Sequence, residues 1–245
     1  ENYDYAMRDA AAAYQMALLW KLTGTEQYAK NVINILNQWA ATCTEVTSND
    51  ANHKLAAGAQ GYTFANAAEI MQTYDGWTEA DKATFKTWIV KVFASKNKDF
   101  LDNHQGSSNC ALHYWSNWDL VNMCSYLSIG ILTEDDDMVN YVINYFYNGA
   151  GNGAFNNLIQ GTHIDPLSNE EICQNQESGR DQGHAQMSAA VTANLCQIAY
   201  TFYQDNKDVA RLDFFAANNN AIMKMGEYVA LSNATDGVKN DNSDG

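Results

Sequence analysis

Pairs of amphipathic helical segments joined by very short connections make up most of this sequence. Apolar residues recur at helical spacing in eight expected helices, 3–22 with 26–41, 62–74 with 79–93, 115–132 with 135–147, and 182–203 with 208–231. Two helices with so short a connection must lie antiparallel, as a helical hairpin. Each hairpin must then bury its apolar face against a neighbouring hairpin. We therefore expect an all-α fold, and both solenoids and (α/α) toroids meet this requirement.

The composition fits one domain over residues 1–245 and limits its partners. Hydrophobic residues make up 46% of the chain and there is a single proline, Pro166, so a sizeable helical core can form. The formal net charge of −15 argues against nucleic acid as a partner, because no basic stripe is present. No apolar run approaches the roughly 20 residues that cross a bilayer, so we expect no membrane insertion.

Both ends of the sequence are polar. Glu1 opens on polar residues, so we expect no signal peptide in this sequence. The tail from Asp236 to Gly245 is predicted to fray, and it is a candidate truncation point.

The metal-binding and nucleotide-binding motifs that a sequence can reveal are missing. The five cysteines form no C-x-x-C pair and no zinc spacing, so we expect buried thiols, with one disulfide left open if the protein is exported. The five histidines include no H-E-x-x-H motif, and no P-loop or dinucleotide fingerprint is present. We expect neither a catalytic metal nor a cofactor.

Three long connections between the hairpins are the expected place for a functional site. They cover about 42–60, 97–113 and 148–178 and are rich in Gly, Asn, His and Gln. Long loops on a rigid helical scaffold usually carry function. In the last of them, residues 169–174 are a candidate short strand.

The stretch Glu177–Gln186 concentrates polar functional groups just before an apolar-periodic helix. Ser178 and Asp181 fit a capping box, which predicts a helix start at Ser178 with Arg180 in its first turn. Arg180 and His184, four residues apart, would then share one helix face. A cation at a helix N-terminus favours an anionic ligand there, and the alternative is a surface salt bridge to Glu177 or Asp181.

Two further stretches combine aromatic and polar residues. Residues 109–119, which begin at Asn109, place a histidine, a tyrosine, two tryptophans and an asparagine at a loop-to-helix junction, where they either bind sugar or plug a helix interface. Residues 55–62 place glycines before Tyr62, whose phenol either lines a cleft or packs in the core.

In order along the chain, these motifs resemble the alginate lyase family of polysaccharide lyases. The resemblance rests on 9–40, 60–70, Asn117–Asp119 and Glu177–His184, of which the last run is the most specific. It implies an (α/α) toroid or an incomplete (α/α) barrel, and β-elimination on a uronic-acid polysaccharide such as alginate or a glucuronan. It also implies an acidic polysaccharide as partner and an exported bacterial protein, periplasmic or extracellular.

The resemblance also implies roles for particular residues. Arg180 and Asn117 would neutralise the uronate carboxylate, His184 or His113 would be the base, and Tyr62 or Tyr114 would protonate the leaving oxygen. The remaining residues would bind the sugars: Gln60, Trp115, Trp118, Glu177 and Gln182. Relatives with an adjacent Asn-His pair differ from this sequence, in which Trp118 follows Asn117, so two histidines stay candidates for the base.

Two other functions fit the same scaffold. A glycoside hydrolase would use two carboxylates, such as Glu177 and Asp119, about 5–9.5 Å apart across the scissile bond. A non-catalytic helical-repeat protein would bind glycans on a concave face without forming a product.

Overall fold

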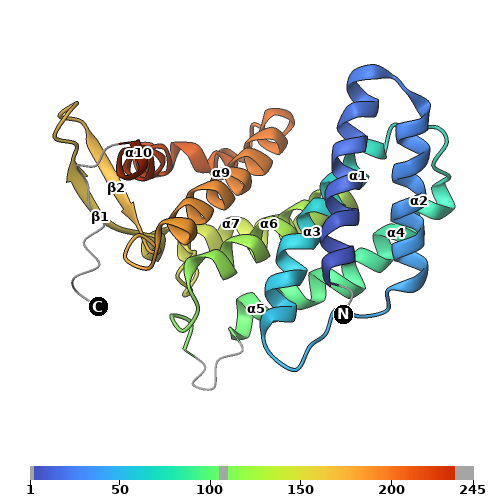
Figure 1. The fold of residues 1–245 in the computed structure, drawn as a ribbon, viewed down its shortest axis with the longest axis horizontal. Coiled ribbons are helices and arrows are strands. Elements are labelled where there is room, and N and C mark those ends of the chain that lie inside the picture. The colour runs from blue at the N-terminus through green and yellow to red at the C-terminus, as the bar shows by residue number, and fades with distance from the viewer. Residues whose placement is uncertain (1–2, 105–109, 235–245) are drawn as a thin grey trace. The chain divides into compact units, whose positions relative to one another are not determined.

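The computed structural model describes residues 3–104 and 110–234, which form two compact units (Figure 1). Unit 1 takes its described residues from 1–102 and 121–140, and unit 2 from 103–120 and 141–245. Helices α6 (Ser116–Thr133) and α7 (Asp136–Asn148) contribute residues to both. Asn109 and the polar tail from Asp236, both named in the sequence analysis, lie outside the described residues.

The first hairpin of unit 1 forms as the sequence predicts. Helix α1 (Tyr3–Thr23) is followed by α2 (Glu26–Thr42), and the turn passes through Gly24 at φ 68°, with the Gly24 N–H donating to Trp20 O at 2.8 Å. A positive φ at the residue that ends a helix is the conformation glycine adopts without strain. Helix α1 packs on its neighbours through a stripe of small buried residues, Ala10, Ala13 and Ala17.

Helix α3 (Asn52–Met71) begins ten residues before the predicted start at residue 62, so the expected loop 42–60 is wrong over its second half. Gly58 and Gly61 do not mark a helix start, because both lie inside α3. They allow close approach to α6: a methyl group on Gly58 would lie 2.6 Å from Val121 Cγ2, and one on Gly61 would meet Ser125. Interhelical packing therefore explains these glycines.

The second hairpin continues further than the sequence indicates. Helix α4 (Glu79–Ile89) is capped by Thr78, whose hydroxyl accepts from the Asp81 N–H at 3.1 Å. A π-helical segment, η1 (Val90–Ala94), leads directly into α5 (Ser95–Asn103), so the expected loop 97–113 is helical to residue 103.

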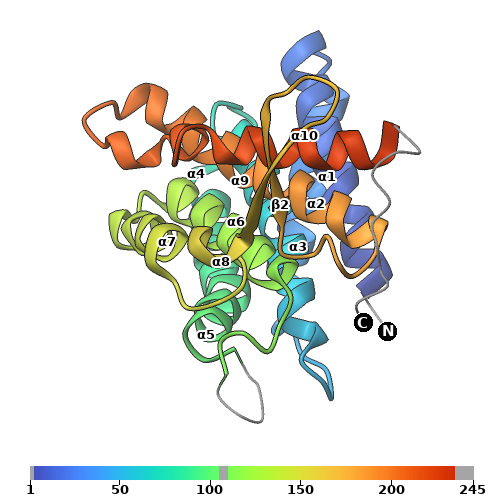
Figure 2. The same cartoon turned by 90° about the vertical axis from the view of Figure 1, so that its left-hand side faces the viewer.

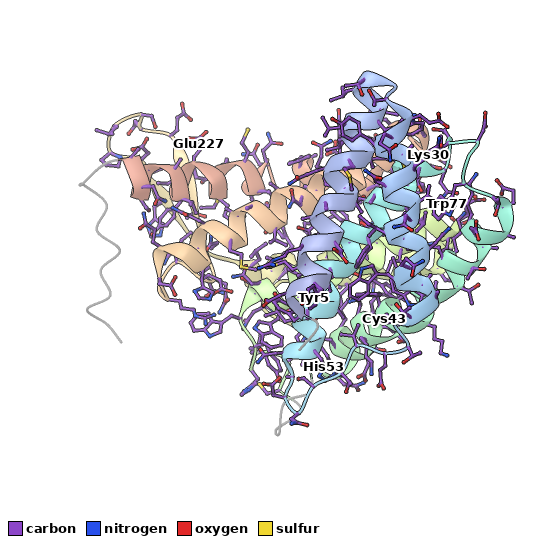
Figure 3. All side chains as sticks on the ribbon, turned by 45° about the vertical axis from the view of Figure 1, so that its right-hand side comes forward. Tyr5, Lys30, Cys43, His53, Trp77 and Glu227 are labelled. Atoms are coloured by element: carbon purple, nitrogen blue, oxygen red, sulfur yellow. The ribbon has the colours of Figure 1, made fainter. Side chains whose placement is uncertain are left out.

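Aromatic side chains form the core of unit 1. The rings of Phe64 and Trp88 lie 6.0 Å apart and those of Phe85 and Trp88 5.2 Å apart, in tilted or edge-on arrangements. Trp77, which is labelled in Figure 3, is buried and satisfies its indole N–H by donating to Asn37 Oδ1 at 3.0 Å.

The α6–α7 turn confirms the third predicted hairpin. The Asp135 N–H donates to Gly130 O at 2.8 Å, and Glu134 takes the left-handed conformation with φ 57°. This turn also lies in unit 1.

Unit 2 contains a small sheet that the sequence predicts only in part. The short helix α8 (Phe155–Leu158) leads into β1 (Ile159–Ile164), which pairs antiparallel with β2 (Glu171–Asn175). Only β2 overlaps the candidate strand at 169–174, and β1 is not predicted. Helix α10 (Ala221–Ala234) packs on β2 (Figure 2).

The fourth predicted hairpin is correct in its first helix and wrong in its second. Helix α9 runs from Gln182 to Asp205, but the chain then forms two 3₁₀ turns, η2 (Ala210–Leu212) and η3 (Phe214–Ala216), before α10. Three consecutive asparagines, 218–220, have φ values of 43°, 57° and 60°. Since a right-handed helix cannot pass through three such residues, the helix expected over 208–231 starts only at Ala221.

The state of the cysteine thiols and the length and hydropathy of the helices were both predicted from the sequence. All five cysteines are free; three are buried, Cys43 is half-buried and Cys110 is exposed, so the expectation of buried thiols holds for three of them. Of the helices that the structure describes, none is both long and apolar enough to cross a membrane.

We predict that Gly58→Ala destabilises the protein. The new methyl group would lie 2.6 Å from Val121 Cγ2 and 2.9 Å from the Val121 main-chain carbon, which cannot move aside as a side chain can. The expected loss is about 1–3 kcal/mol in the free energy of unfolding, although alanine is the better helix former. Urea unfolding followed by circular dichroism measures it.

Gly226→Ala in α10 is the matched control. Among the described residues, its methyl group meets no packed neighbour within 4 Å, so we expect a gain of about 0.5–1 kcal/mol. A Gly58→Ala protein as stable as the wild type would contradict the close packing of α3 on α6.

Candidate active site

The turn before α9 differs from the sequence prediction and places Arg180 outside the helix. Helix α9 begins at Gln182 and its N-cap is Asp181, whose side chain accepts from the His184 N–H at 2.9 Å. Ser178, the predicted cap, is buried and donates its hydroxyl to Asn175 Oδ1 at 3.0 Å instead. The predicted helix start at Ser178 is therefore wrong, and Arg180 and His184 do not share a helix face.

A buried carboxylate, Glu177, joins this turn to the N-terminus of α6. Its side chain is fully buried, and its Oε1 accepts from the Asn117 N–H at 3.1 Å and from the Ser116 hydroxyl at 3.5 Å. Gln176 Oε1 accepts from the Ser116 N–H at 2.9 Å. Two side chains from a distant segment thus satisfy main-chain donors at the positive end of a helix, where an anion is stabilised.

Burial raises the pKa of Glu177 above its ordinary value. The Asn117 N–H and the Arg180 guanidinium both oppose this rise, because they stabilise the ionised carboxylate. The second carboxylate oxygen of Glu177 lies 3.4 Å from a terminal nitrogen of Arg180.

Arg180 lies between two acids and against an aromatic ring. Its Nε is 3.9 Å from Asp181 Oδ2, and its guanidinium carbon lies 5.0 Å from the centre of the Trp115 ring. The alternative interpretation, a salt bridge to Glu177 or Asp181, is thus present with both partners, although Glu177 is buried and not on the surface. The side chain is nevertheless 32% exposed, so the guanidinium keeps room for an anionic ligand.

Asp181 also holds the ring of His184. The carboxylate lies 2.6 Å from His184 Nδ1 and must accept there, so in the neutral ring the proton is on Nδ1 and the lone pair is on Nε2. The His184 main-chain N–H, and after it the ring, hold the pKa of Asp181 below its ordinary value. Asp181 was missed as a functional residue in the sequence, where the spacing Asp-x-x-His at a helix start was the available signal.

Asn117 is buried beside these groups with one polar atom unsatisfied. Its side-chain amide donates to the main-chain oxygen of His184 at 3.3 Å. Its Oδ1 is buried and has no hydrogen-bond partner within the part of the chain that the structure describes. An unsatisfied buried acceptor costs about 1–3 kcal/mol, which marks this position as one where packing alone does not account for the residue.

An aromatic segment precedes α6. The rings of Tyr114 and Trp118 lie 4.6 Å apart, and His113 meets Tyr114 edge-on at 4.9 Å. Trp115 is 38% exposed and carries Arg180 against its ring. Burial raises the pKa of Tyr114, so its phenol keeps its proton more firmly than an exposed tyrosine.

The structure therefore groups most of the predicted site residues in unit 2. Asn117, Glu177, Arg180 and His184 form one contact network with Asp181 and Trp115. Gln182 donates to Asn233 Oδ1 of α10. The two remaining predicted residues lie on α3 in unit 1, where Gln60 is buried and Tyr62 is half-buried.

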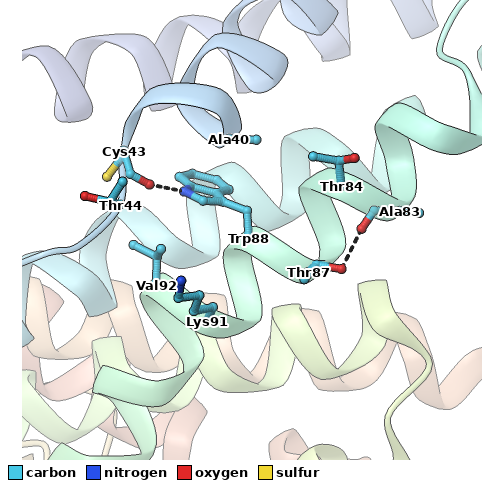
Figure 4. Close-up of a pocket in the computed structure, with 9 residues that line it drawn as sticks. All are labelled: Ala40, Cys43, Thr44, Ala83, Thr84, Thr87, Trp88, Lys91 and Val92. Carbon is cyan, nitrogen blue, oxygen red and sulfur yellow. Dashed lines mark hydrogen bonds between the residues drawn. The ribbon is translucent and has the colours of Figure 1, made fainter.

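A depression in unit 1 offers less chemistry than this network. Figure 4 shows the residues that line it: Ala40, Cys43, Thr44, Ala83, Thr84, Thr87, Trp88, Lys91 and Val92. Lys91 is the one charged side chain in this set, and no acid or histidine accompanies it. Within the described parts of the chain, no group of three or more His, Cys, Asp or Glu residues could hold a metal ion.

Comparisons with known proteins identify the family of this chain. The family model described as "Alginate lyase" matches residues 1–238. Two solved structures of alginate lyase A1-III are similar, a histidine-to-alanine variant at 16% identity and a tyrosine-to-phenylalanine variant at 18%, each complexed with a tetrasaccharide. Each superposes with a TM-score of 0.64 over 93% of this chain and 59% of the other, so this chain spans about three fifths of their length. The search of curated proteins found no match. The structural likeness confirms the predicted all-α, (α/α) toroid fold class.

We predict that Glu177→Gln changes the pH dependence of stability. Because burial raises the pKa of Glu177, the folded protein keeps this proton to a higher pH than the unfolded chain. The stability of the wild type relative to the variant is then greatest below the ordinary glutamic acid pKa of about 4.3 and falls as the pH rises through the folded-state pKa. Urea unfolding of both proteins across this range measures the difference.

Glu227→Gln controls for the loss of one carboxylate, because Glu227 is exposed on α10 (labelled in Figure 3). A wild type that gains stability relative to Glu177→Gln as the pH rises would contradict the prediction.

Proposed function

The chain belongs to the alginate lyase family, and we propose that it cleaves a uronic-acid polysaccharide, alginate or a glucuronan, by β-elimination. The observation that carries this proposal is the partly exposed Arg180, held by Glu177 and Asp181 against Trp115. A guanidinium in this position suits bidentate recognition of a sugar carboxylate.

The reaction needs a charge stabilised next to a weak carbon acid. A base takes the proton from C5 of the uronate, the C4–C5 double bond forms, and the bond from C4 to the glycosidic oxygen breaks with protonation of that oxygen. Negative charge develops on the C5 carboxylate as the C5 proton leaves, so a fixed cation at the carboxylate lowers the barrier. In this proposal Arg180 supplies the charge and Asn117 supports it from the start of α6.

The proposed base is His184, with His113 as the alternative. Asp181 fixes the Nδ1–H of His184, so Nε2 is free to accept a proton. His113 packs edge-on against Tyr114, and no acid is shown beside its ring.

The proposed acid is Tyr114 or Tyr62. The raised pKa of Tyr114 suits a phenol that stays protonated until the leaving oxygen takes its proton. Tyr62 lies on α3 in unit 1 and stays the second candidate.

The remaining predicted residues divide between sugar binding and support. Trp115 and Trp118 offer ring faces to sugars, and Gln60 and Gln182 offer amides. Glu177 is fully buried, so its part in the proposal is to hold Arg180 and Asn117 in place.

The structure weighs against the hydrolase alternative. Glu177 and Asp119, the two carboxylates expected for it, are both fully buried and engaged in hydrogen bonds. A hydrolase needs its two carboxyl groups on either side of an exposed bond. An acidic polysaccharide also fits an exported protein, which we propose to be periplasmic or extracellular.

We predict that a panel of uronans identifies a substrate by the ultraviolet absorbance of a C4–C5 unsaturated end. Arg180→Ala should lower kcat/KM by about 10²-fold or more, because it removes one preorganised charge from the transition state. Reducing ends without this absorbance would support the hydrolase, and saturable binding without product would support the binding protein.

Arg211→Ala is the matched control for Arg180→Ala. Arg211 also lies in unit 2 with its guanidinium over an aromatic ring, 4.9 Å from the centre of Tyr147, and it makes no contact with the network of Arg180 among the contacts described. We expect its activity to equal the wild type. Full activity in a folded Arg180→Ala protein would remove Arg180 from the mechanism.

We also predict that Asp181→Asn lowers kcat by about 10²-fold or more with little change in KM. Asparagine caps a helix as well as aspartate does, so α9 should stay intact while the charge that orients His184 is lost. Asp213→Asn is the control, because Asp213 caps η3 by accepting from the Ala216 N–H without touching a histidine. An unchanged kcat in Asp181→Asn would exclude His184, held by Asp181, as the base.

A further inference from the structure

The aromatic segment, residues 110–115, has an irregular backbone. It lies outside helices and strands; the His113 N–H donates to Cys110 O at 3.0 Å, and Trp115 O accepts from the Trp118 N–H at 3.0 Å. Leu112 and Trp115 are 54% and 38% exposed. Something outside the segment must fix it if its rings are to meet a ligand in one arrangement.

A buried side chain, Asn152, provides support of this kind. Asn152 is 9% exposed and donates its amide to two main-chain oxygens of the segment, Tyr114 O at 2.7 Å and Leu112 O at 3.2 Å. These carbonyls belong to the residues on either side of His113, and the second of them, Tyr114 O, directly precedes Trp115. Asn152 therefore fixes the backbone that carries all three of the segment's ring side chains.

A glycine on each side of Asn152 lets the loop that carries it lie close against its neighbours. A methyl group on Gly151 would lie 2.6 Å from His104 Nε2, and one on Gly153 would lie 2.8 Å from Ser116 O. The Gly153 N–H donates to Asp119 Oδ2 at 3.1 Å. Larger residues at 151 or 153 would push the loop away from α6 and move the Asn152 amide off its acceptors.

Asp119 is held in turn by two buried groups. The Tyr145 hydroxyl donates to Asp119 Oδ1 at 2.7 Å, and His104 Nε2 lies 2.8 Å from the same oxygen. Burial, and after it the negative charge of Asp119, raise the pKa of Tyr145, so the tyrosine stays a donor. Asp119, His104 and Tyr145 are all buried, so this support is rigid compared with the exposed segment.

We propose that Asn152 is a positioning residue that sets residues 112–115 as a platform for a sugar ring beside Arg180. The proposal rests on the proposed function, since it assigns the platform to the same uronan site. Trp115 connects the two features, because its ring carries the Arg180 guanidinium. A platform of this kind acts on the binding of neighbouring sugars. The same backbone also carries Tyr114 and His113, which are candidates for the acid and the base.

The test is steady-state kinetics of Asn152→Ala on the uronan that the wild type cleaves. We expect KM to rise about tenfold or more, as for a loss of uniform binding. A fall in kcat beside it would assign the acid to Tyr114, which the same backbone carries, and a kcat within about threefold of the wild type would assign it to Tyr62. Asn156→Ala is the matched control: it lies in the same connection and donates to the main-chain oxygen of Tyr147, away from the segment. It should match the wild type in both constants.

A double-mutant cycle with Trp115→Ala separates positioning from general stability. If Asn152 acts through the platform, the KM effects of the two substitutions should overlap, so that the double variant is no worse than Trp115→Ala alone within about twofold. Asn152→Ser, which keeps one donor, gives an intermediate KM and serves if the alanine variant does not fold.

An unchanged KM in a folded Asn152 variant, or fully multiplicative effects in the cycle, would overturn the proposal. A wild type without elimination activity would refute the proposed function instead. In that case, Trp fluorescence titration with a uronan oligosaccharide tests the platform. The wild type should then bind most tightly, Asn152→Ser less tightly and Asn152→Ala least tightly. A wild type that neither cleaves nor binds overturns both proposals.

Discussion

A buried carboxylate sets the geometry on which the proposed chemistry depends. Glu177 reaches the first turn of α6 with one oxygen and the guanidinium of Arg180 with the other, without contact with solvent. Removing an ion from water is costly, and here the N–H donors at a helix start and an opposite charge offset that cost only in part, because the pKa of Glu177 stays raised. The same contacts bring Asn117 and Arg180, from separate stretches of sequence, to one place. Asp181 adds a second acid that shares Arg180 and orients His184.

The parts of the fold that follow from local sequence were predictable. The turn at Gly24 and the first and third hairpins depend on apolar periodicity and short connections, and all appear as expected. The predicted helices and strands are wrong where tertiary contacts determine the local structure. The sequence predicts a helix start at residue 62, after Gly58 and Gly61, but these residues lie inside α3 and are small because α6 packs against them. Strand β1 has no alternating pattern and exists because β2 pairs with it, and the asparagines at 218–220 delay α10 through their left-handed backbone.

The candidate site shows the same division. Arg180, His184, Asn117 and Glu177 could be named from sequence because they lie in short polar motifs beside helices, and the structure places them in one network. The predicted cap, Ser178, lies three residues before the observed cap, Asp181, because Ser178 donates its hydroxyl to Asn175, a buried partner that only the folded chain provides. Asn152 lies in no motif, and its meaning depends on two carbonyls about forty residues earlier in the chain.

Recognition of a uronate carboxylate by Arg180 is the contact on which the proposed elimination depends. Calorimetry can test it directly by comparing a uronan oligosaccharide with the same oligosaccharide after its carboxylates have been reduced to alcohols. We expect the wild type to bind the acidic form at least about tenfold more tightly, as for a charge-assisted bidentate contact, and Arg180→Ala to lose this preference. Equal affinity of the wild type for both forms, or an undiminished preference in Arg180→Ala, would contradict it.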